Sequence, residues 1–188
     1  MTKLAVMVSG VGSILEAILE SGLQVSLVVA DRQCRGLKLA ADAGIPVELV
    51  ERSNYGHSFD RLAYSHRLAG VLKAHHIDLV AMAGFMTVLD KPIFDHYEGK
   101  ILNTHPSLLP AFAGERAVQN ALDYGVKLTG CTIHIATIKL DDGPILAQEA
   151  VPVLAGDTAE SLQERIKQVE RRLYPETIRH LITKASPV

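Results

Sequence analysis

Short runs of consecutive apolar residues alternate with helix-like segments through the first half of the chain, and this alternation limits the fold more than any other feature. Unbroken apolar runs are typical of strands buried on both faces, because a strand with one face in water alternates apolar and polar residues. We therefore expect a largely parallel sheet with helices on both faces. Strands are predicted at residues 4–8, 25–29, 47–50, 78–82 and 100–103, and helices from residue 14, over residues 37–43 and through the apolar positions 59, 62, 63, 68, 71 and 72.

The second half of the chain has a different pattern. Residues 128–135 and 144–153 predict two strands joined by a polar loop, which favours an antiparallel pair. A long helix is predicted to close the chain, with Asp157 or Thr158 as its cap and Glu160 in its first turn. The predicted fold class is α/β: a Rossmann-like, mostly parallel twisted sheet with helices on both faces and a C-terminal antiparallel extension.

Composition and charge tell against several classes of protein. With 48% hydrophobic and 21% charged residues among 188, the chain can bury one sizeable core, which suits a single domain. The net charge of -2 and the absence of a basic block argue against a nucleic-acid partner. Cys34 and Cys131 are too few and too far apart for a disulfide framework or a zinc site. No apolar run is long enough for a membrane span, so we expect a soluble, cytoplasmic protein.

A glycine turn follows the first predicted strand, at residues 10–15. Its two glycines let the backbone approach a ligand, and the start of the next helix favours an anion. Three readings are open: a dinucleotide site with Asp31 as the ribose-binding acid, a single-phosphate site, and a purely structural turn. Leu15 stands where a dinucleotide fingerprint has its third glycine, and no Gly-Lys-Ser/Thr follows, so a single phosphate fits best.

Three loops are expected to meet in one crevice, because ligands of such sheets bind beyond the carboxyl ends of the strands. These loops are the glycine turn, residues 84–86 after the fourth strand, and residues 103–105 after the fifth. Their convergence would give the chain a single active site.

Asn103 and His105 form the most informative polar pair. Alternate residues of an extended segment point to the same side, and Pro106 biases His105 away from helical backbone. An amide beside an imidazole can stabilise negative charge on a carbonyl oxygen during acyl transfer. A nearby Asp141 would favour the imidazolium form of His105, although the sequence Asp-Asp-Gly-Pro that begins at Asp141 also predicts a simple turn. Spacing alone does not decide between these two interpretations.

Five segments carry a resemblance to a known family: residues 83–86, 103–110, 125–134, 140–145 and 172–175. In this order they closely resemble the folate-dependent phosphoribosylglycinamide formyltransferases of purine synthesis, and the likeness extends over nearly the whole chain. The resemblance implies 10-formyltetrahydrofolate as the formyl donor, the amine of phosphoribosylglycinamide as the acceptor and no metal. It also implies one formyltransferase domain over residues 1–188, with a phosphate-binding half at 1–100 and a catalytic and folate-binding half at 101–188.

The resemblance assigns roles to particular positions. Asn103 and His105 match residues that stabilise a tetrahedral oxyanion, with Asp141 assisting, and His134 matches a supporting histidine near the site. The residues that match the phosphoribosylglycinamide site are Gly12, Ser13, Ile14, Lys167, Gln168, Val169 and Glu170. Those that match the folate site are Arg61, Met86, Thr87, Val88, Leu89, Asn103, Thr137, Ile138, Lys139, Leu140 and Asp141.

The chain departs from the family pattern at three places. Ile14 replaces an asparagine of the phosphate loop, so a backbone cradle survives while a side-chain contact is lost. Thr87 replaces an arginine, which removes a charge near the folate tail. Glu115 and Arg116 stand where the family often has a histidine. These changes bear on affinity and on which phosphorylated amine is accepted, and they leave the residues of the formyl chemistry in place.

Rival functions share the scaffold or the first glycine turn. A formyltetrahydrofolate deformylase uses water in place of the amine and carries an additional N-terminal domain, whereas this sequence begins at its first strand. A transfer-RNA formyltransferase is less favoured, because such enzymes carry a C-terminal nucleic-acid domain and the charge of this chain is not basic. A dinucleotide-dependent oxidoreductase or a non-catalytic nucleotide-binding module would be compatible with the glycine turn alone. We expect the transferase, as a monomer or a homodimer.

Overall fold

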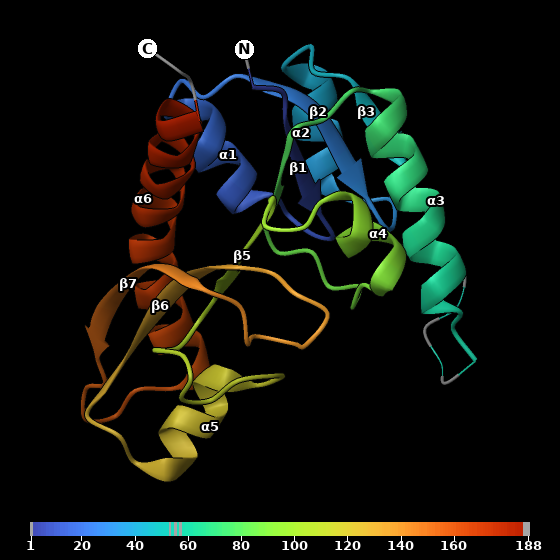
Figure 1. Cartoon of the computed structure of the whole chain (residues 1–188). Helices are drawn as coiled ribbons and strands as arrows, with labels where there is room; N and C mark the ends of the chain where they lie inside the picture. The colour runs from blue at the N-terminus through green and yellow to red at the C-terminus, as the bar shows by residue number, and fades with distance from the viewer. Residues whose placement is uncertain (1, 53, 55, 57, 186–188) are drawn as a thin grey trace. The chain divides into compact units, whose positions relative to one another are not determined.

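The computed structural model describes residues 2–52, 54, 56 and 58–185. The chain divides into two compact units, Met1–Leu102 and Asn103–Pro187 (Figure 1). The organisation expected from the sequence, one domain with halves at 1–100 and 101–188, stays a prediction.

Parallel strands form the centre of the first unit. They are β1 (Leu4–Val8), β2 (Val25–Ala30), β3 (Val47–Leu49) and β4 (Leu79–Met82), in the order β3-β2-β1-β4, with the start of β5 beside β4. All pairs among these four strands are parallel. Every residue of β1 is fully buried, as its unbroken apolar run predicts.

Four helices connect these strands: α1 (Ser13–Glu20), α2 (Arg35–Asp42), α3 (Arg61–Ala74) and α4 (Lys91–His96). α1 packs against α2, and α3 packs against α4. Right-handed crossovers place these two pairs on opposite faces of the parallel strands. Phe59 was expected to lie on the third helix, but it precedes α3, because the Asp60 carboxylate caps the helix by accepting the N–H of Ala63 at 2.9 Å.

The second unit contains the antiparallel part of the sheet. Its strands are the last three residues of β5 (Ile101–His105), then β6 (Leu128–Ile135) and β7 (Ile145–Pro152), in the order β5-β6-β7. β6 and β7 pair antiparallel, from Leu128 opposite Pro152 to His134 opposite Ile145. With the parallel strands of the first unit, this pair confirms the predicted fold class.

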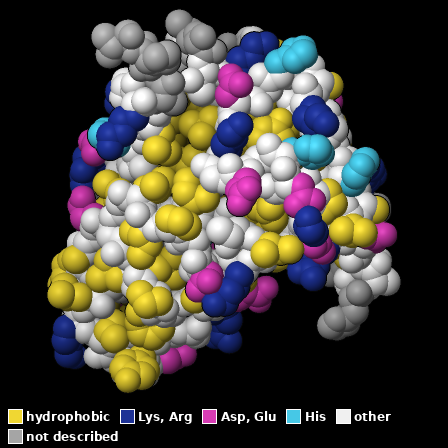
Figure 2. All heavy atoms as spheres, in the orientation of Figure 1, with side chains coloured by type: hydrophobic (Ala, Val, Ile, Leu, Met, Phe, Trp, Pro, Cys, Tyr) yellow, Lys and Arg dark blue, Asp and Glu magenta, His cyan; other side chains and the backbone are white. Residues whose placement is uncertain are grey.

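Two helices complete the second unit. α5 (Ala117–Tyr124) packs against α6 (Ala159–Ala185), and α6 also covers β6 and β7. Thr158, one of the two predicted caps, accepts the N–H of Ser161 at 3.2 Å, and Asp157 is tied to Arg165 instead. Figure 2 shows many hydrophobic side chains over the part of this unit that contains β6 and β7. Within the described residues, no helix has both the length and the apolar character needed to cross a bilayer.

Candidate active site

The end of β5 presents its polar side chains in two directions. The predicted strand ended at Asn103, but β5 continues through His105, so Asn103, Thr104 and His105 keep the alternation of an extended strand. Asn103 and His105 therefore share one side. Thr104 takes the other, where its hydroxyl lies 3.4 Å from the Cys131 thiol. The strand thus fixes the spacing of the amide and the imidazole.

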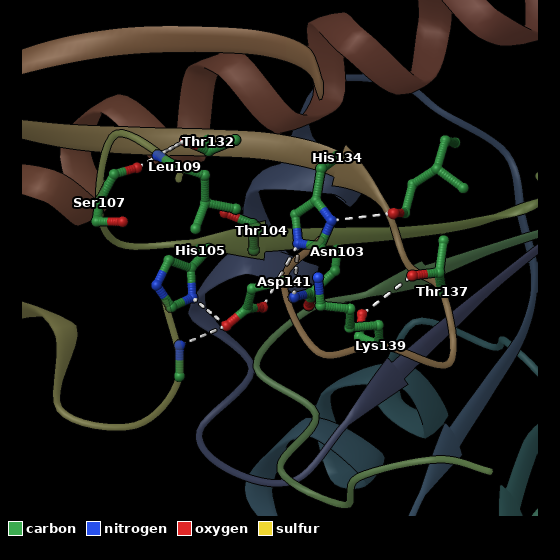
Figure 3. Close-up of polar contacts among 12 residues, drawn as sticks. Asn103, Thr104, His105, Ser107, Leu109, Thr132, His134, Thr137, Lys139 and Asp141 are labelled. Carbon is green, nitrogen blue, oxygen red and sulfur yellow. Dashed lines mark hydrogen bonds and ion pairs between the residues drawn. The ribbon is translucent and has the colours of Figure 1, made fainter. Parts of the chain in front are cut away.

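His105 and Asp141 form the buried pair that the sequence left undecided (Figure 3). The Nδ1 atom of His105 lies 3.3 Å from Oδ2 of Asp141, and the two side chains are only 8% and 4% exposed. On the other edge of the ring, Nε2 donates to the Phe112 carbonyl at 2.8 Å. Both ring nitrogens face oxygen acceptors, and only the imidazolium form can donate to both at once. Asp141 is therefore more than a turn residue.

The backbone around Asp141 is held in an unusual conformation. Asp141 has a φ of 53° and Phe112 a φ of 53°, both in the left-handed region. Such non-glycine residues cost about 1–3 kcal/mol each, and they persist where the surrounding contacts fix them. Oδ2 of Asp141 accepts the Gly114 N–H at 2.8 Å, in addition to facing His105. The two loops thus fix each other through the carboxylate.

His134 orients the amide of Asn103. Burial lowers the pKa of His134, which favours the neutral ring although Asp141 lies close. Nδ1 of His134 donates to the Ile135 carbonyl at 3.0 Å, so Nε2 carries the lone pair and accepts from Nδ2 of Asn103 at 3.2 Å. Oδ1 of Asp141 is 3.7 Å from the same Nε2, which is too long for a hydrogen bond. His134 is therefore suited to hold the Asn103 amide, the supporting role that the resemblance implies.

A carboxyl group on α6 lies behind the same strand. Burial raises the pKa of Glu170 to about 7, against the opposing effects of a hydrogen bond with the Thr104 side chain and the charges of Lys167 and Arg171. The Thr104 contact joins the predicted ribonucleotide-binding segment 167–170 to the residue between Asn103 and His105. Cys131, beside Thr104, is buried, and this raises the pKa of its thiol to about 12, so it stays protonated.

The glycine turn of the first unit has the features of an anion site. Gly12 has a φ of 81°, and a side chain there would meet the Cα atom of Gly36 at 2.9 Å, so both conformation and space require glycine. Gly12 precedes α1, which has no side-chain cap, so the first N–H groups of the helix lack internal acceptors. The Ile14 side chain is buried, and this residue can therefore offer a ligand only its backbone.

The loop after β4 is tied down by Ser9 and Asp31. Ser9 Oγ accepts the Met86 N–H at 2.8 Å, and Thr87 Oγ1 donates to Asp31 Oδ2 at 2.7 Å. Asp31 is fully buried, and it also accepts from Arg32 at 2.9 and 3.0 Å. Burial alone would raise the pKa of Asp31, but hydrogen bonds from Arg32, Thr87 and Ser9 outweigh it and lower the pKa. A carboxylate occupied in this way cannot bind a ribose, which removes the basis of the dinucleotide interpretation.

The predicted folate-site residues differ in what they can offer a ligand. Met86, Val88, Ile138 and Leu140 are exposed apolar side chains, whereas Thr87 and Leu89 are buried and can contribute only backbone groups. The remaining predicted residues are the exposed first residue of α3, Arg61; the exposed Lys139 and Gln168; and the partly buried Ser13, Thr137, Lys167 and Val169.

Several groups of the site carry no signal in the sequence. The Phe112 carbonyl and the Gly114 N–H belong to the backbone, and every residue has such groups. The pairing of Thr104 with Glu170 joins positions far apart in the chain. The sequence shows Gly114 two residues after Phe112, but nothing in it indicates that the Gly114 N–H would meet the Asp141 carboxylate. The expected convergence of the glycine turn and the loop after β4 on the end of β5 stays a prediction.

Among residues 2–52, 54, 56 and 58–185, no group of three or more His, Cys, Asp or Glu side chains is arranged to hold a metal ion.

Comparison with known proteins adds a family likeness over most of the chain. The profile of the formyl transferase family matches residues 2–178. The phosphoribosylglycinamide formyltransferase of Mycobacterium tuberculosis is 43% identical over 186 residues, which cover 96% of this chain and 85% of that protein. The enzyme of the same name from Bacillus subtilis is 36% identical over 189 residues, covering 97% and 95%. The crystal structure of glycinamide ribonucleotide transformylase 1 from Symbiobacterium toebii superimposes with a TM-score of 0.92 at 40% identity, covering 100% of this chain and 91% of that one.

Proposed function

The chain belongs to the formyl transferase family, and from that premise we propose that it transfers the formyl group of 10-formyltetrahydrofolate to the amine of phosphoribosylglycinamide in purine synthesis. Similarity to proteins named phosphoribosylglycinamide formyltransferase, over nearly their whole length, supports this acceptor. A 40% identical glycinamide ribonucleotide transformylase of the same fold supports it further.

The observation that carries the proposal is the buried His105–Asp141 pair beside the Asn103 amide. Formyl transfer passes through a tetrahedral intermediate in which the carbonyl oxygen becomes negative. Donors fixed before the reaction stabilise this charge without having to reorganise. Asn103 offers an amide N–H, and His105 offers an imidazolium whose charge is balanced by a carboxylate 3.3 Å away.

The chemistry then follows in two steps. The lone pair of the acceptor amine attacks the formyl carbon, and the carbonyl π electrons move to the oxygen, where Asn103 and His105 donate hydrogen bonds. When the intermediate collapses, the bond between the formyl carbon and N10 of the folate breaks. N10 gains a proton as it leaves and the former amine loses one. The proton that the amine loses passes through water to Asp141 and from there to N10 as it leaves, so Asp141 is a carboxylate again at the end of the reaction.

The remaining predicted residues have properties that suit binding. The uncapped N-terminus of α1 suits a phosphate. Exposed apolar side chains at Ile138 and Leu140, close in sequence to Asp141, suit the flat ring of a folate. Glu170 suits the hydroxyl groups of a ribonucleotide. We assign Gly12, Ser13, Ile14 and residues 167–170 to the ribonucleotide, and Arg61, residues 86–89 and residues 137–141 to the folate.

One assay separates this function from its rivals. The protein is mixed with 10-formyltetrahydrofolate, with and without phosphoribosylglycinamide, and release of tetrahydrofolate is followed. We expect release only when the acceptor is present, together with formylation of its amine. Formate release without an acceptor would indicate a deformylase, and no release under either condition would contradict folate chemistry altogether.

We further propose that the enzyme works in the cytoplasm, on small molecules and without a metal ion. The chelator EDTA should leave the rate unchanged, and a rate restored only by an added metal would contradict this part. Fractionation of the source cells tests the location.

A further inference from the structure

Both ring nitrogens of His105 already face a protein oxygen in this structure. An imidazolium ring carries two N–H donors. Nδ1 faces Oδ2 of Asp141 at 3.3 Å, and Nε2 donates to the Phe112 carbonyl at 2.8 Å. The formyl oxygen also needs an N–H from this ring if His105 is to stabilise the oxyanion. One of the two contacts must therefore be exchanged during the reaction.

The two contacts differ in what their loss would do. If His105 separated from Asp141, a buried carboxylate and a buried imidazolium would each lose their partner. This would cost much free energy, because both side chains are less than a tenth exposed. Separation from Phe112 releases only a neutral carbonyl on a half-exposed residue, which water can solvate. The Phe112 contact is thus the one to be exchanged.

We propose that the backbone of residues 112–114 positions the catalytic pair through two groups with different fates: the Phe112 carbonyl holds Nε2 of His105 until the formyl oxygen takes its place, while the Gly114 N–H holds Asp141 throughout. This inference rests on the proposed formyl transfer. The Phe112 carbonyl occupies the position that the formyl oxygen takes later, so the His105 ring is oriented and carries both N–H groups before the folate binds.

The loop is built to hold this position and still be able to move. Ser107 Oγ donates to the Ala111 carbonyl at 2.5 Å, which fixes the start of the loop. The Phe112 ring packs edge-on against Tyr124 at 6.0 Å between centroids. Phe112 and Arg116 nevertheless have φ values of 53° and 60°, which non-glycine residues rarely adopt. A segment held in this conformation by a few contacts can rearrange when one contact is replaced.

The ring N–H groups can be observed directly by NMR. With ¹⁵N-labelled histidine, long-range ¹H–¹⁵N spectra report each ring nitrogen, and His105→Gln identifies the signals of His105. Without substrates we expect both its N–H protons to be protected from exchange. A folate analogue that carries a non-transferable carbonyl should move the Nε2 signal and leave the Nδ1 signal in place. An Nε2 proton that exchanges at the solvent rate without substrates, or an Nε2 signal unmoved by the analogue, would overturn the proposal.

A matched pair of glycine variants tests the second backbone group. Gly114 and Gly125 have φ values of 84° and 81°, and an added side chain would meet nothing within 4 Å at either position. Gly114→Ala and Gly125→Ala therefore introduce the same backbone strain, but only Gly114 contacts Asp141. We expect Gly114→Ala to lower kcat about 10–100-fold with little change in KM, by analogy with the loss of a group that orients a catalytic ligand. Gly125→Ala should keep kcat within about twofold.

Rescue distinguishes positioning from general damage. Asparagine adopts positive φ more readily than alanine, so Gly114→Asn should recover most of the kcat that Gly114→Ala loses. Equal losses of kcat in the Gly114→Ala and Gly125→Ala variants would refute the positioning role. Protected ring protons in a protein without transferase activity would refute the proposed function and leave the backbone contacts standing. Full activity with an exposed Nε2 proton would refute this inference alone.

Discussion

Two buried aspartates lie in different parts of this molecule, and their partners differ in kind. Asp31 follows β2 in the first unit, is fully buried, and accepts hydrogen bonds from Arg32 and Thr87. Asp141 lies after β6 in the second unit, with a side chain 4% exposed, and faces His105, His134 and the Gly114 N–H. Both carboxylates are well satisfied.

The difference lies in the chemistry of the partners. Arg32 keeps its charge at every relevant pH, and the Thr87 hydroxyl does not titrate, so the Asp31 cluster has a single state. Histidines can gain and lose protons near neutral pH, so the Asp141 cluster can change its state during a reaction. The backbone conformation agrees. Of the described non-glycine residues with positive φ, Phe112, Arg116 and Asp141 lie in the loops of the second cluster, whereas the fourth, His76, lies just after α3. A buried aspartate with permanent partners is structural, whereas one with titratable partners is suited to catalysis.

The strongest test exchanges each aspartate for its amide. Asp141→Asn removes the carboxylate charge that faces Nδ1 of His105 at 3.3 Å, and we expect kcat to fall about 10³–10⁴-fold with folding preserved, as for other aspartates that support a catalytic histidine. Asp31→Asn should lower the free energy of unfolding by about 1–3 kcal/mol, because Arg32 loses its charged acceptor, and should change kcat only slightly. Steady-state kinetics and urea unfolding of both variants measure the two effects. A catalytic loss in Asp31→Asn equal to that in Asp141→Asn would break the comparison.

Asn103→Ala tests the amide donor that lies beside the Asp141 cluster. Loss of one donor to an oxyanion costs about 10²–10³-fold in kcat, and we expect a loss of this size with KM nearly unchanged. The circular dichroism spectrum and the melting temperature should match those of the wild type, because the amide is partly exposed and, within the described residues, the substitution removes one side-chain hydrogen bond, that with His134. Near-normal turnover would remove Asn103 from the mechanism.

Glu170 gives a pH dependence between pH 4.5 and 7, a range in which the Asp31 cluster should have none because the pKa of Asp31 is lowered from 3.8. Burial raises the pKa of Glu170 from its ordinary 4.5 to about 7. Between these values the folded protein binds more protons than the unfolded chain, so stability is greatest below pH 4.5 for this group and declines as pH rises through the folded pKa. The free energy of unfolding of the wild type should therefore fall by about 1–3 kcal/mol over this pH range, and Glu170→Gln should not show that fall. Urea unfolding at a series of pH values checks this; parallel curves for variant and wild type would contradict the raised pKa.

Thr87→Val is the mildest change and tests the static cluster. It removes the 2.7 Å hydrogen bond to Asp31 while keeping the shape of the side chain. We expect the free energy of unfolding to fall by about 1 kcal/mol, a typical value for one hydrogen bond. Thr87→Ser, which keeps the hydroxyl, serves as the control and should retain more of that stability. A variant as stable as the wild type would mean that Arg32 and Ser9 suffice to hold Asp31.

Much of the fold could be predicted because its determinants are local. The apolar run at residues 4–8 predicted β1 with the same bounds as in the structure, and the pattern at residues 128–135 did so for β6. The errors lie at element ends, where one side chain decides: the Asp60 cap excludes Phe59 from α3, and β5 runs on to His105. Asp31 was open to a ribose-binding interpretation, because sequence distance does not reveal that Thr87 closes over it.

The sequence by itself determined the chemical types and their order: strand–helix alternation from apolar periodicity, and Asn103 and His105 on one side of a strand from the two-residue repeat. Only the tertiary structure decided that Asp141 meets His105, that His134 holds the Asn103 amide, and that the Phe112 carbonyl caps the second ring nitrogen. The physical reason is that periodicity reflects neighbours along the chain, whereas these contacts join residues far apart in it. Some of them are made by backbone groups, which every residue has, so only the folded chain decides which of those groups meet.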